Sequence, residues 1–231
     1  MKLLVSPVNL NEVKAAIDGG ADIIDIKNPK EGSLGASFPW MIQGARDIIP
    51  PGVELSATLG DLDYKPGTAS LAAYGLSKLR VDYVKAGLFG IRNPMQAEDM
   101  SKNLKKASNG TRLVLAGYAD FEKVGAISPM LLPKIASQAG AFGVMIDTAI
   151  KNGKTLFSHF EEQELKKFID EAHALGLTAA LAGSLSFDDV IRLKEMGADI
   201  SGVRGIVCTN GDRTHGSISK EKVKNLAMLV K

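Results

Sequence analysis

An aspartate and a lysine stand two residues apart at the end of an apolar segment near the N-terminus. Residues 19–29 read Gly-Gly-Ala-Asp-Ile-Ile-Asp-Ile-Lys-Asn-Pro, and the isoleucines predict a buried strand that Asn28-Pro29 ends. Side chains alternate along a strand, so Asp25 and Lys27 share one face. Burying both charges is costly unless they pair or take part in chemistry. The segment is therefore either a structural ion pair or part of a reactive site.

The chemistry open to a buried lysine is nucleophilic. Burial lowers the pKa of the amine, and a neutral amine can attack a carbonyl carbon to form a Schiff base. Lys27 is a candidate for this reaction. Lys85, inside another small, apolar stretch, Asp82-Tyr-Val-Lys85-Ala-Gly, and Lys151 also stand at strand ends, and at least one of the three is expected to be catalytic.

Predicted strands and helices alternate along the chain. Apolar runs predict strands at roughly 3–7, 21–27, 53–59, 82–87, 112–117, 142–147, 177–182 and 200–205. Helices are expected between and after them, at roughly 10–19, 38–48, 67–79, 94–107, 129–139, 160–175, 187–196 and 220–230. Eight strand–helix units without a linker favour an α/β fold, a closed (β/α)₈ TIM barrel forming one domain over residues 1–231. An open doubly wound sheet is the alternative, but no Gly-x-Gly-x-x-Gly follows a strand.

In such a barrel the carboxyl ends of the strands build the active site. A weak internal repeat, Gly20–Lys27 against Gly197–Arg204 with similar spacing in Gly140–Asp147, places three charged residues at the same strand end. The residues expected to converge there are Asp25, Lys27, Lys85, Asp147, Lys151 and Arg204. Clustered cations lower one another's pKa and attract anions.

The loops after the last two strands predict a phosphate site. Gly183-Ser184 offers backbone N–H groups before a helix N-terminus, and Arg204-Gly205 adds a cation with close backbone approach. Arg213, further along, either meets a phosphate or is only solvated. The glycine-rich segment 28–39 is either a lid over the mouth or an ordinary long loop.

Composition excludes several other functions. Net charge is +2 with 45% hydrophobic residues, so no basic field indicates nucleic acid. The lone Cys208 excludes an internal disulfide, and His159, His173 and His215 lack metal-ligand spacing, so no metal is expected. No apolar run approaches the roughly 20 residues of a membrane span. We expect a soluble, cytoplasmic protein with a small-molecule substrate.

Seven motifs in order along the chain resemble one enzyme family, the (5-formylfuran-3-yl)methyl phosphate synthases of methanofuran biosynthesis. They are Asp25-Ile-Lys-Asn-Pro-Lys-Glu-Gly-Ser-Leu-Gly-Ala36, Tyr64-Lys-Pro-Gly-Thr68, Val84-Lys-Ala-Gly-Leu88, Ala116-Gly-Tyr-Ala-Asp120, Asp147-Thr-Ala-Ile-Lys-Asn-Gly-Lys-Thr-Leu156, Ala182-Gly-Ser184 and Gly202-Val-Arg-Gly205. The resemblance covers essentially the whole chain.

The resemblance implies a lyase that condenses two molecules of glyceraldehyde 3-phosphate with loss of phosphate and water, without a metal or organic cofactor. It implies Lys27 as the Schiff-base lysine and Lys85 as a proton-transfer group. Asp25, Asp147 and Lys151 match the remaining polar positions. An iminium at Lys27 would acidify the neighbouring carbon, and Asp25 is the base beside it. Gly183, Ser184, Arg204 and Gly205 are expected to hold one phosphate, and the second phosphate site is not assigned.

Two other functions remain open at this point. A class I aldolase or isomerase acting on another sugar phosphate would use the same lysine but form no furan. A non-catalytic barrel that binds a phosphorylated metabolite would form no covalent adduct. We also expect a homo-oligomer, for which the helix at 67–79 offers a candidate face.

Overall fold

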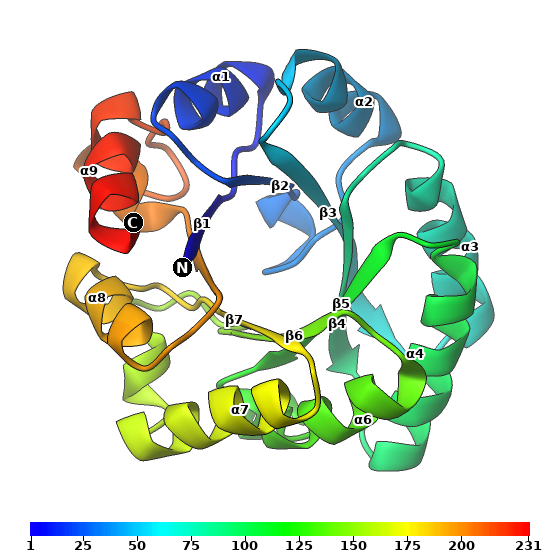
Figure 1. The fold of residues 1–231 in the computed structure, drawn as a ribbon. Helices are drawn as coiled ribbons and strands as arrows, with labels where there is room; N and C mark the ends of the chain where they lie inside the picture. The colour runs from blue at the N-terminus through cyan, green and yellow to red at the C-terminus, as the bar shows by residue number, and fades with distance from the viewer.

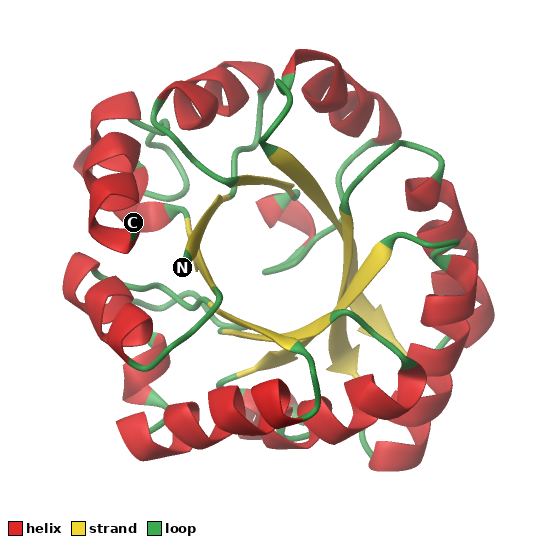
Figure 2. Cartoon of the chain, viewed as in Figure 1, coloured by secondary structure: helices red, strands yellow, loops and turns green.

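The computed structural model describes all residues 1–231 and confirms the (β/α)₈ barrel. Eight parallel strands close in the order β1 to β8, with β8 pairing β1. Figure 2 shows the closed ring of strands surrounded by helices. The strands are β1 Lys2–Val5, β2 Ile23–Ile26, β3 Glu54–Asp63, β4 Tyr83–Gly90, β5 Arg112–Tyr118, β6 Gly143–Asp147, β7 Thr178–Leu181 and β8 Ile200–Val203. None of the helices is long and apolar enough to cross a membrane.

The helices form the outer layer of the barrel, as Figure 1 shows. They are α1 Leu10–Asp18, α2 Pro39–Ile48, α3 Pro66–Ser77, α4 Pro94–Ala107, α5 Phe121–Val124, α6 Leu132–Ala139, α7 Glu162–Ala174, α8 Phe187–Glu195 and α9 Lys220–Val230. Side chains cap the N-termini of two helices: the Asn9 side chain accepts from the Glu12 N–H, and the Ser186 side chain accepts from the Asp189 N–H. Pro66 and Pro94 occupy first-turn positions.

Strand alternation divides the core into two parts. A cluster of 55 buried residues, which includes Ile24 and Ile26, lies between the strands and the helices. A cluster of 11 buried residues, which includes Ile23 and Met145, fills the inside of the barrel. Asp25 and Lys27 therefore face inward while Ile24 and Ile26 face the helices, as the period of two predicts.

Two regions differ from the expected elements. Strands β3 and β4 run past the expected ends at 59 and 87 and pair with each other beyond the rim, through Asp61 with Gly87 and Asp63 with Gly90. The expected helix at 129–139 begins as a separate 3₁₀ turn, Pro129–Leu131, because Pro133 lies at the start of α6. The short α5 was not expected, since four residues carry no helical periodicity.

The segment after β2 folds back across the barrel mouth and is held there. Its Leu34 is fully buried in the inner cluster, and Figure 1 shows this mid-blue segment within the ring of strands. The Ser33 hydroxyl donates to the Thr148 carbonyl at 2.8 Å, and Thr58 Oγ1 donates to the Gly35 carbonyl at 2.8 Å. Segment 28–39 is thus anchored on β3 and on the loop after β6, and it closes the β3–β5 side of the mouth.

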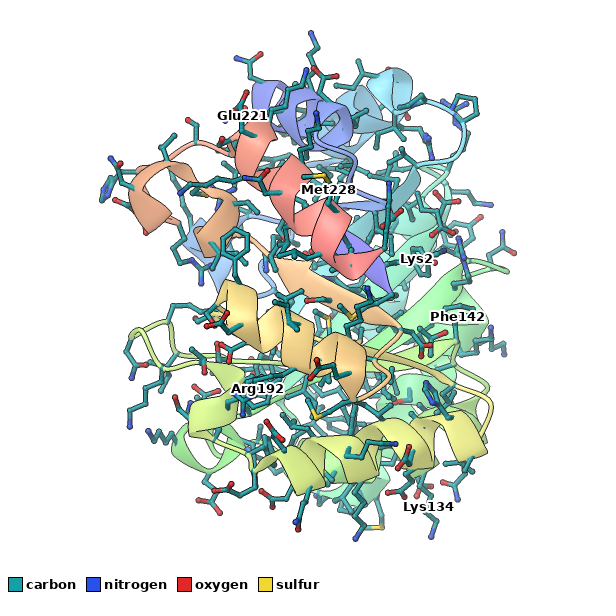
Figure 3. The ribbon with its side chains drawn as sticks, turned by 60° about the vertical axis from the view of Figure 1, so that its left-hand side comes forward. Lys2, Lys134, Phe142, Arg192, Glu221 and Met228 are labelled. Atoms are coloured by element: carbon teal, nitrogen blue, oxygen red, sulfur yellow. The ribbon has the colours of Figure 1, made fainter.

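The amino end of the barrel carries its own ion network. Glu54 accepts from Lys2 at 2.6 Å and pairs with Arg112 at 2.7 Å. The Arg112 guanidinium lies over the Tyr83 ring, 3.8 Å from its centroid, with Phe142 on the same side. Figure 3 shows Lys2 and Phe142 at this edge of the molecule. This network lies at the end opposite the candidate site.

Candidate active site

A cavity of about 410 Å³ opens at the carboxyl ends of the strands, mainly on the side of β1 and β6 to β8. Its charged lining residues are Lys27, Lys85, Asp147, Lys151, Arg204, Asp212 and Arg213. Gly183, Ser184 and Gly205 also line it. The structure thus brings together all the predicted site residues except Asp25, which lies fully buried just beneath and contacts Lys85.

Asp25 and Lys85 form a buried ion pair across the inside of the barrel. Lys85 Nζ donates to Asp25 Oδ2 at 2.7 Å, and the Ser6 hydroxyl donates to the same oxygen at 3.1 Å. The strand between them, β3, places Ser56 beside Asp25 and Thr58 beside Lys85. These small side chains leave room for Lys85 to reach β2. Asp25 is therefore paired with Lys85 rather than with its sequence neighbour Lys27.

Asp147, at the end of β6, forms the second pair. Lys151 Nζ donates to Asp147 Oδ1 at 2.7 Å and to Thr148 Oγ1 at 2.9 Å. Asp147 Oδ2 lies 3.8 Å from Lys27 Nζ, on the opposite wall of the barrel. One carboxylate thus faces two lysines, and Lys27 stands between the two lysine–aspartate pairs.

This environment sets the charge of Lys27. Burial and the neighbouring Lys85 and Lys151 cations lower its pKa from 10.5 to about 8, although Asp147 and Asp25 oppose the shift. Burial alone would raise the pKa of Asp147, but Lys151 and Lys27 outweigh it and hold the pKa well below the usual range. A sizeable fraction of Lys27 is therefore neutral near physiological pH while Asp147 stays ionised.

The predicted phosphate loops lie on the wall formed by β7 and β8. Gly183 and Ser184 both have positive φ, +117° and +52°, so the chain turns sharply before α8. The backbone N–H groups of Gly183, Ser184 and Leu185 donate no hydrogen bond within the protein. Such consecutive free N–H groups beside a helix N-terminus form an anion-binding concavity.

Arg204 lies at this wall, but its guanidinium is turned to the protein. Its Nη1 donates to Glu12 Oε2 at 2.7 Å and to the Ser6 carbonyl at 2.9 Å, and its Nε donates to the Arg213 carbonyl at 2.9 Å. Glu12, on α1, is buried and also accepts from the Val8 N–H. Arg204 therefore joins the end of β1, α1 and the loop after β8.

Two residues of the sequence motifs hold loops at the mouth in place, and their partners are visible only in the folded structure. Asp120 accepts from the N–H groups of Ala149 and Ile150 at 2.7 and 2.8 Å, and so fixes the loop that carries Lys151. Tyr118, fully buried, donates to Asp61, which in turn faces the Leu34 N–H. The Ala116–Asp120 motif was a visible signal for both residues, but their partners come from other loops. No group of three or more His, Cys, Asp or Glu side chains is arranged to hold a metal ion.

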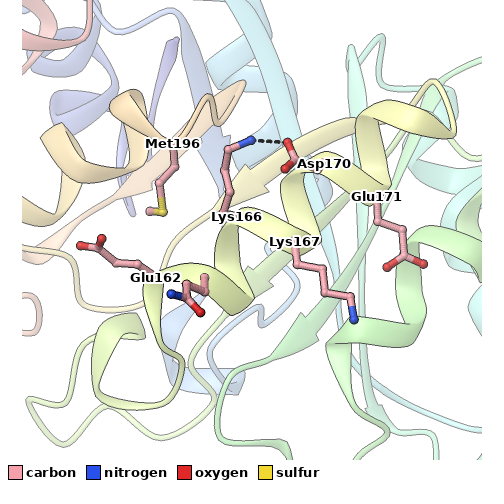
Figure 4. A pocket seen from close by; sticks show the side chains of 7 residues that line it. Glu162, Lys166, Lys167, Asp170, Glu171 and Met196 are labelled. Carbon is pink, nitrogen blue, oxygen red and sulfur yellow. Dashed lines mark hydrogen bonds and ion pairs between the residues drawn. The ribbon is translucent and has the colours of Figure 1, made fainter.

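A second hollow lies outside the barrel, along α7. Figure 4 shows its lining of charged side chains, with the Lys166 amine paired to Asp170 one turn on. These side chains are largely exposed, and an exposed ion pair such as Lys166–Asp170 contributes little to stability.

Comparison with known proteins gives a consistent result at the sequence level. The family model described as 4-HFC-P synthase matches residues 3–227. A (5-formylfuran-3-yl)methyl phosphate synthase of Methanocaldococcus jannaschii is 52% identical over 235 residues, covering all of both chains. The protein of the same name from Methanothermobacter thermautotrophicus is 47% identical, covering 100% of this chain and 99% of that one.

Solved structures resemble the chain in fold alone. 3-Hexulose-6-phosphate synthase superposes with a TM-score of 0.67 at 18% identity, covering all of both chains. Phosphoribosyl anthranilate isomerase from Thermus thermophilus gives 0.65 at 13% identity, covering 100% of this chain and 98% of that one.

Proposed function

The chain belongs to the (5-formylfuran-3-yl)methyl phosphate synthase family, and on that premise we propose that it condenses two molecules of glyceraldehyde 3-phosphate through a Schiff base at Lys27. Two three-carbon phosphates would give the six-carbon (5-formylfuran-3-yl)methyl phosphate. Atom balance then requires release of one phosphate and two waters. The reaction serves methanofuran biosynthesis.

The position and the lowered pKa of the Lys27 amine are the main support for this proposal. Its amine lines a cavity, has a pKa lowered to about 8 and lies 3.8 Å from an ionised carboxylate. A neutral amine attacks the triose carbonyl, water leaves, and the cationic iminium faces Asp147. The iminium draws electrons from the neighbouring carbon, so its proton becomes acidic and an enamine can form. The enamine carbon then bonds to the aldehyde carbon of the second triose.

The later steps need proton donors and acceptors on both sides of Lys27. Lys85 lines the cavity with Asp25 behind it, so this pair can exchange a proton with the substrate while the ion pair keeps Lys85 in place. Lys151, held by Asp147 and Thr148, is the acid available on the other side for the departing phosphate and hydroxyl oxygens. Asp25 has Lys85 and Ser6 on Oδ2 but no partner on its buried Oδ1, so Oδ1 is the atom through which it would act as the base beside Lys27.

The experiment is mass spectrometry of the protein mixed with glyceraldehyde 3-phosphate, with and without borohydride. Borohydride reduces an iminium to a stable secondary amine, so we expect an adduct on the Lys27 peptide and a phosphorylated furan aldehyde in solution. Lys27→Arg keeps the cation and should lose both. Lys134→Arg is the matched control, since Lys134 is exposed on α6 (Figure 3) and should behave as wild type.

The outcomes separate the alternatives. An adduct without furan product would favour an aldolase or isomerase that acts on another sugar phosphate. No adduct and no product from folded protein would contradict the proposal and favour a non-catalytic binding barrel.

A further inference from the structure

One cation at the mouth has no partner in the protein. Arg213 lies in the loop after β8 and lines the cavity, yet its guanidinium makes no hydrogen bond or ion pair. The other cations there are engaged: Lys85 with Asp25, Lys151 with Asp147, and Arg204 with Glu12. Lys27 faces Asp147. Arg213 is therefore the cation of the cavity lining that has no hydrogen bond or ion pair to the protein and can give all its side-chain donors to a ligand.

The backbone of Arg213 is fixed even though its side chain is free. Its carbonyl accepts from Arg204 Nε at 2.9 Å, which ties the loop to the barrel. Asp212 Oδ1 accepts from the N–H groups of Thr214 and His215 at 2.7 and 2.9 Å. These bonds turn the Asp212 carboxylate toward the loop, and it forms no ion pair with Arg213. The loop thus presents a guanidinium without neutralising it.

The neighbouring loop, which follows β7, completes an anion site. The free N–H groups of Gly183, Ser184 and Leu185 border the same cavity, at the turn before α8. Burial and the neighbouring Arg204 cation lower the pKa of Arg213, although Asp147 opposes this shift. A phosphate bound beside the guanidinium would favour its charged form.

We propose that Arg213, rather than Arg204, is the arginine that binds the phosphate group of one triose phosphate, together with the N–H groups of residues 183–185. A guanidinium can offer two parallel N–H donors to phosphate oxygens, and three backbone N–H groups can take the others. Arg204 anchors the loop that carries Arg213. This inference rests on the proposed function for the identity of the ligand.

The test uses glycerol 3-phosphate, which has the phosphate of the substrate but no carbonyl, so binding does not depend on a Schiff base. Calorimetric titration should show that glycerol 3-phosphate binds to the wild-type protein. For Arg213→Ala the dissociation constant should be roughly 10- to 100-fold higher, which corresponds to the loss of hydrogen bonds to a charged group. Arg213→Lys keeps the positive charge but lacks the two parallel N–H donors of the guanidinium, so its dissociation constant should be intermediate. Arg80→Ala, at an arginine whose side chain is 72% exposed, is the control and should bind as wild type.

The results distinguish this inference from the proposed function. If glycerol 3-phosphate binding depends on Arg213 but no furan forms, the phosphate site stands and the proposed reaction fails. If furan forms and folded Arg213→Ala binds as wild type, the assignment to Arg213 is overturned. Absence of binding to wild type would also overturn it. A circular dichroism melt of each variant checks that it folds.

Discussion

The barrel encloses charged groups at both ends, and the two ends behave differently. At the mouth, Asp25, Lys27, Lys85, Asp147 and Lys151 are all buried or nearly so, with cations outnumbering acids. At the amino end, Lys2, Glu54 and Arg112 form a half-exposed network with Tyr83. A hollow of about 460 Å³ lies at the amino end too, so neither charge nor space by itself marks the site.

The two ends of the barrel differ in whether a group can change its protonation state near neutral pH. At the amino end, burial raises the pKa of Tyr83, and hydrogen bonds from Lys2 and Arg112 outweigh burial and lower the pKa of Glu54. Both groups are thereby held more firmly in their neutral-pH state, and Arg112 stacks on a ring. At the mouth, Lys27 has a pKa of about 8 and can change state near neutral pH. An amine without a full complement of partners thus indicates chemistry, whereas a network in which every group is paired indicates a structural role.

The largest effect is expected from removing the Lys85 side of the buried Lys85–Asp25 ion pair. Lys85→Met leaves Asp25, which is 0% exposed, without its counter-ion, and an uncompensated buried charge costs about 3–5 kcal/mol. We expect turnover to fall by at least ~100-fold as well, since a proton-transfer group is lost. Urea unfolding and furan formation measure the two effects. Adding Asp25→Asn should recover much of the stability but none of the activity; a double variant as unstable as Lys85→Met would contradict the buried pair.

Removing a cation at the amino end of the barrel should reduce stability less and leave activity nearly unchanged. Arg112→Met removes a guanidinium that is 32% exposed, together with its contacts to Glu54 and the Tyr83 ring. We expect the free energy of unfolding to fall by about 1–2 kcal/mol, with furan formation within about twofold of wild type. Steady-state kinetics beside the denaturation curve would check this. A large loss of activity in a folded Arg112→Met protein would show that the two ends are coupled.

The smallest effect is a shift in pH dependence. Adduct formation needs neutral Lys27, so its rate should rise about tenfold per pH unit below 8 and level off above it. Asp147 raises the pKa of Lys27, so Asp147→Asn should move this inflection to lower pH. Borohydride trapping at a series of pH values measures it. Arg112→Met should leave the inflection unchanged, and an inflection near 10 in wild type would contradict the assignment.

Much of the fold followed from local patterns. The eight strand–helix units followed from the alternation of apolar runs and helical patterns. The grouping of Lys27, Lys85, Asp147 and Lys151 at one mouth was predicted because strand ends in a barrel share an edge. The extra length of β3 and β4 was not, since Asp61 and Asp63 read as loop residues until the two strands pair.

Alternation along a strand is a local property, so the residues of β2 alone place Asp25 and Lys27 on one face. Their partners depend instead on which strands the closed barrel brings together. Asp25 pairs with Lys85 because β3 between them carries small side chains, and Lys27 faces Asp147 because closure brings β6 opposite β2. Likewise, Arg204 and Arg213 are both cations after β8 in the sequence. The buried Glu12 of α1, nearly two hundred residues earlier, leaves one of them occupied and the other free.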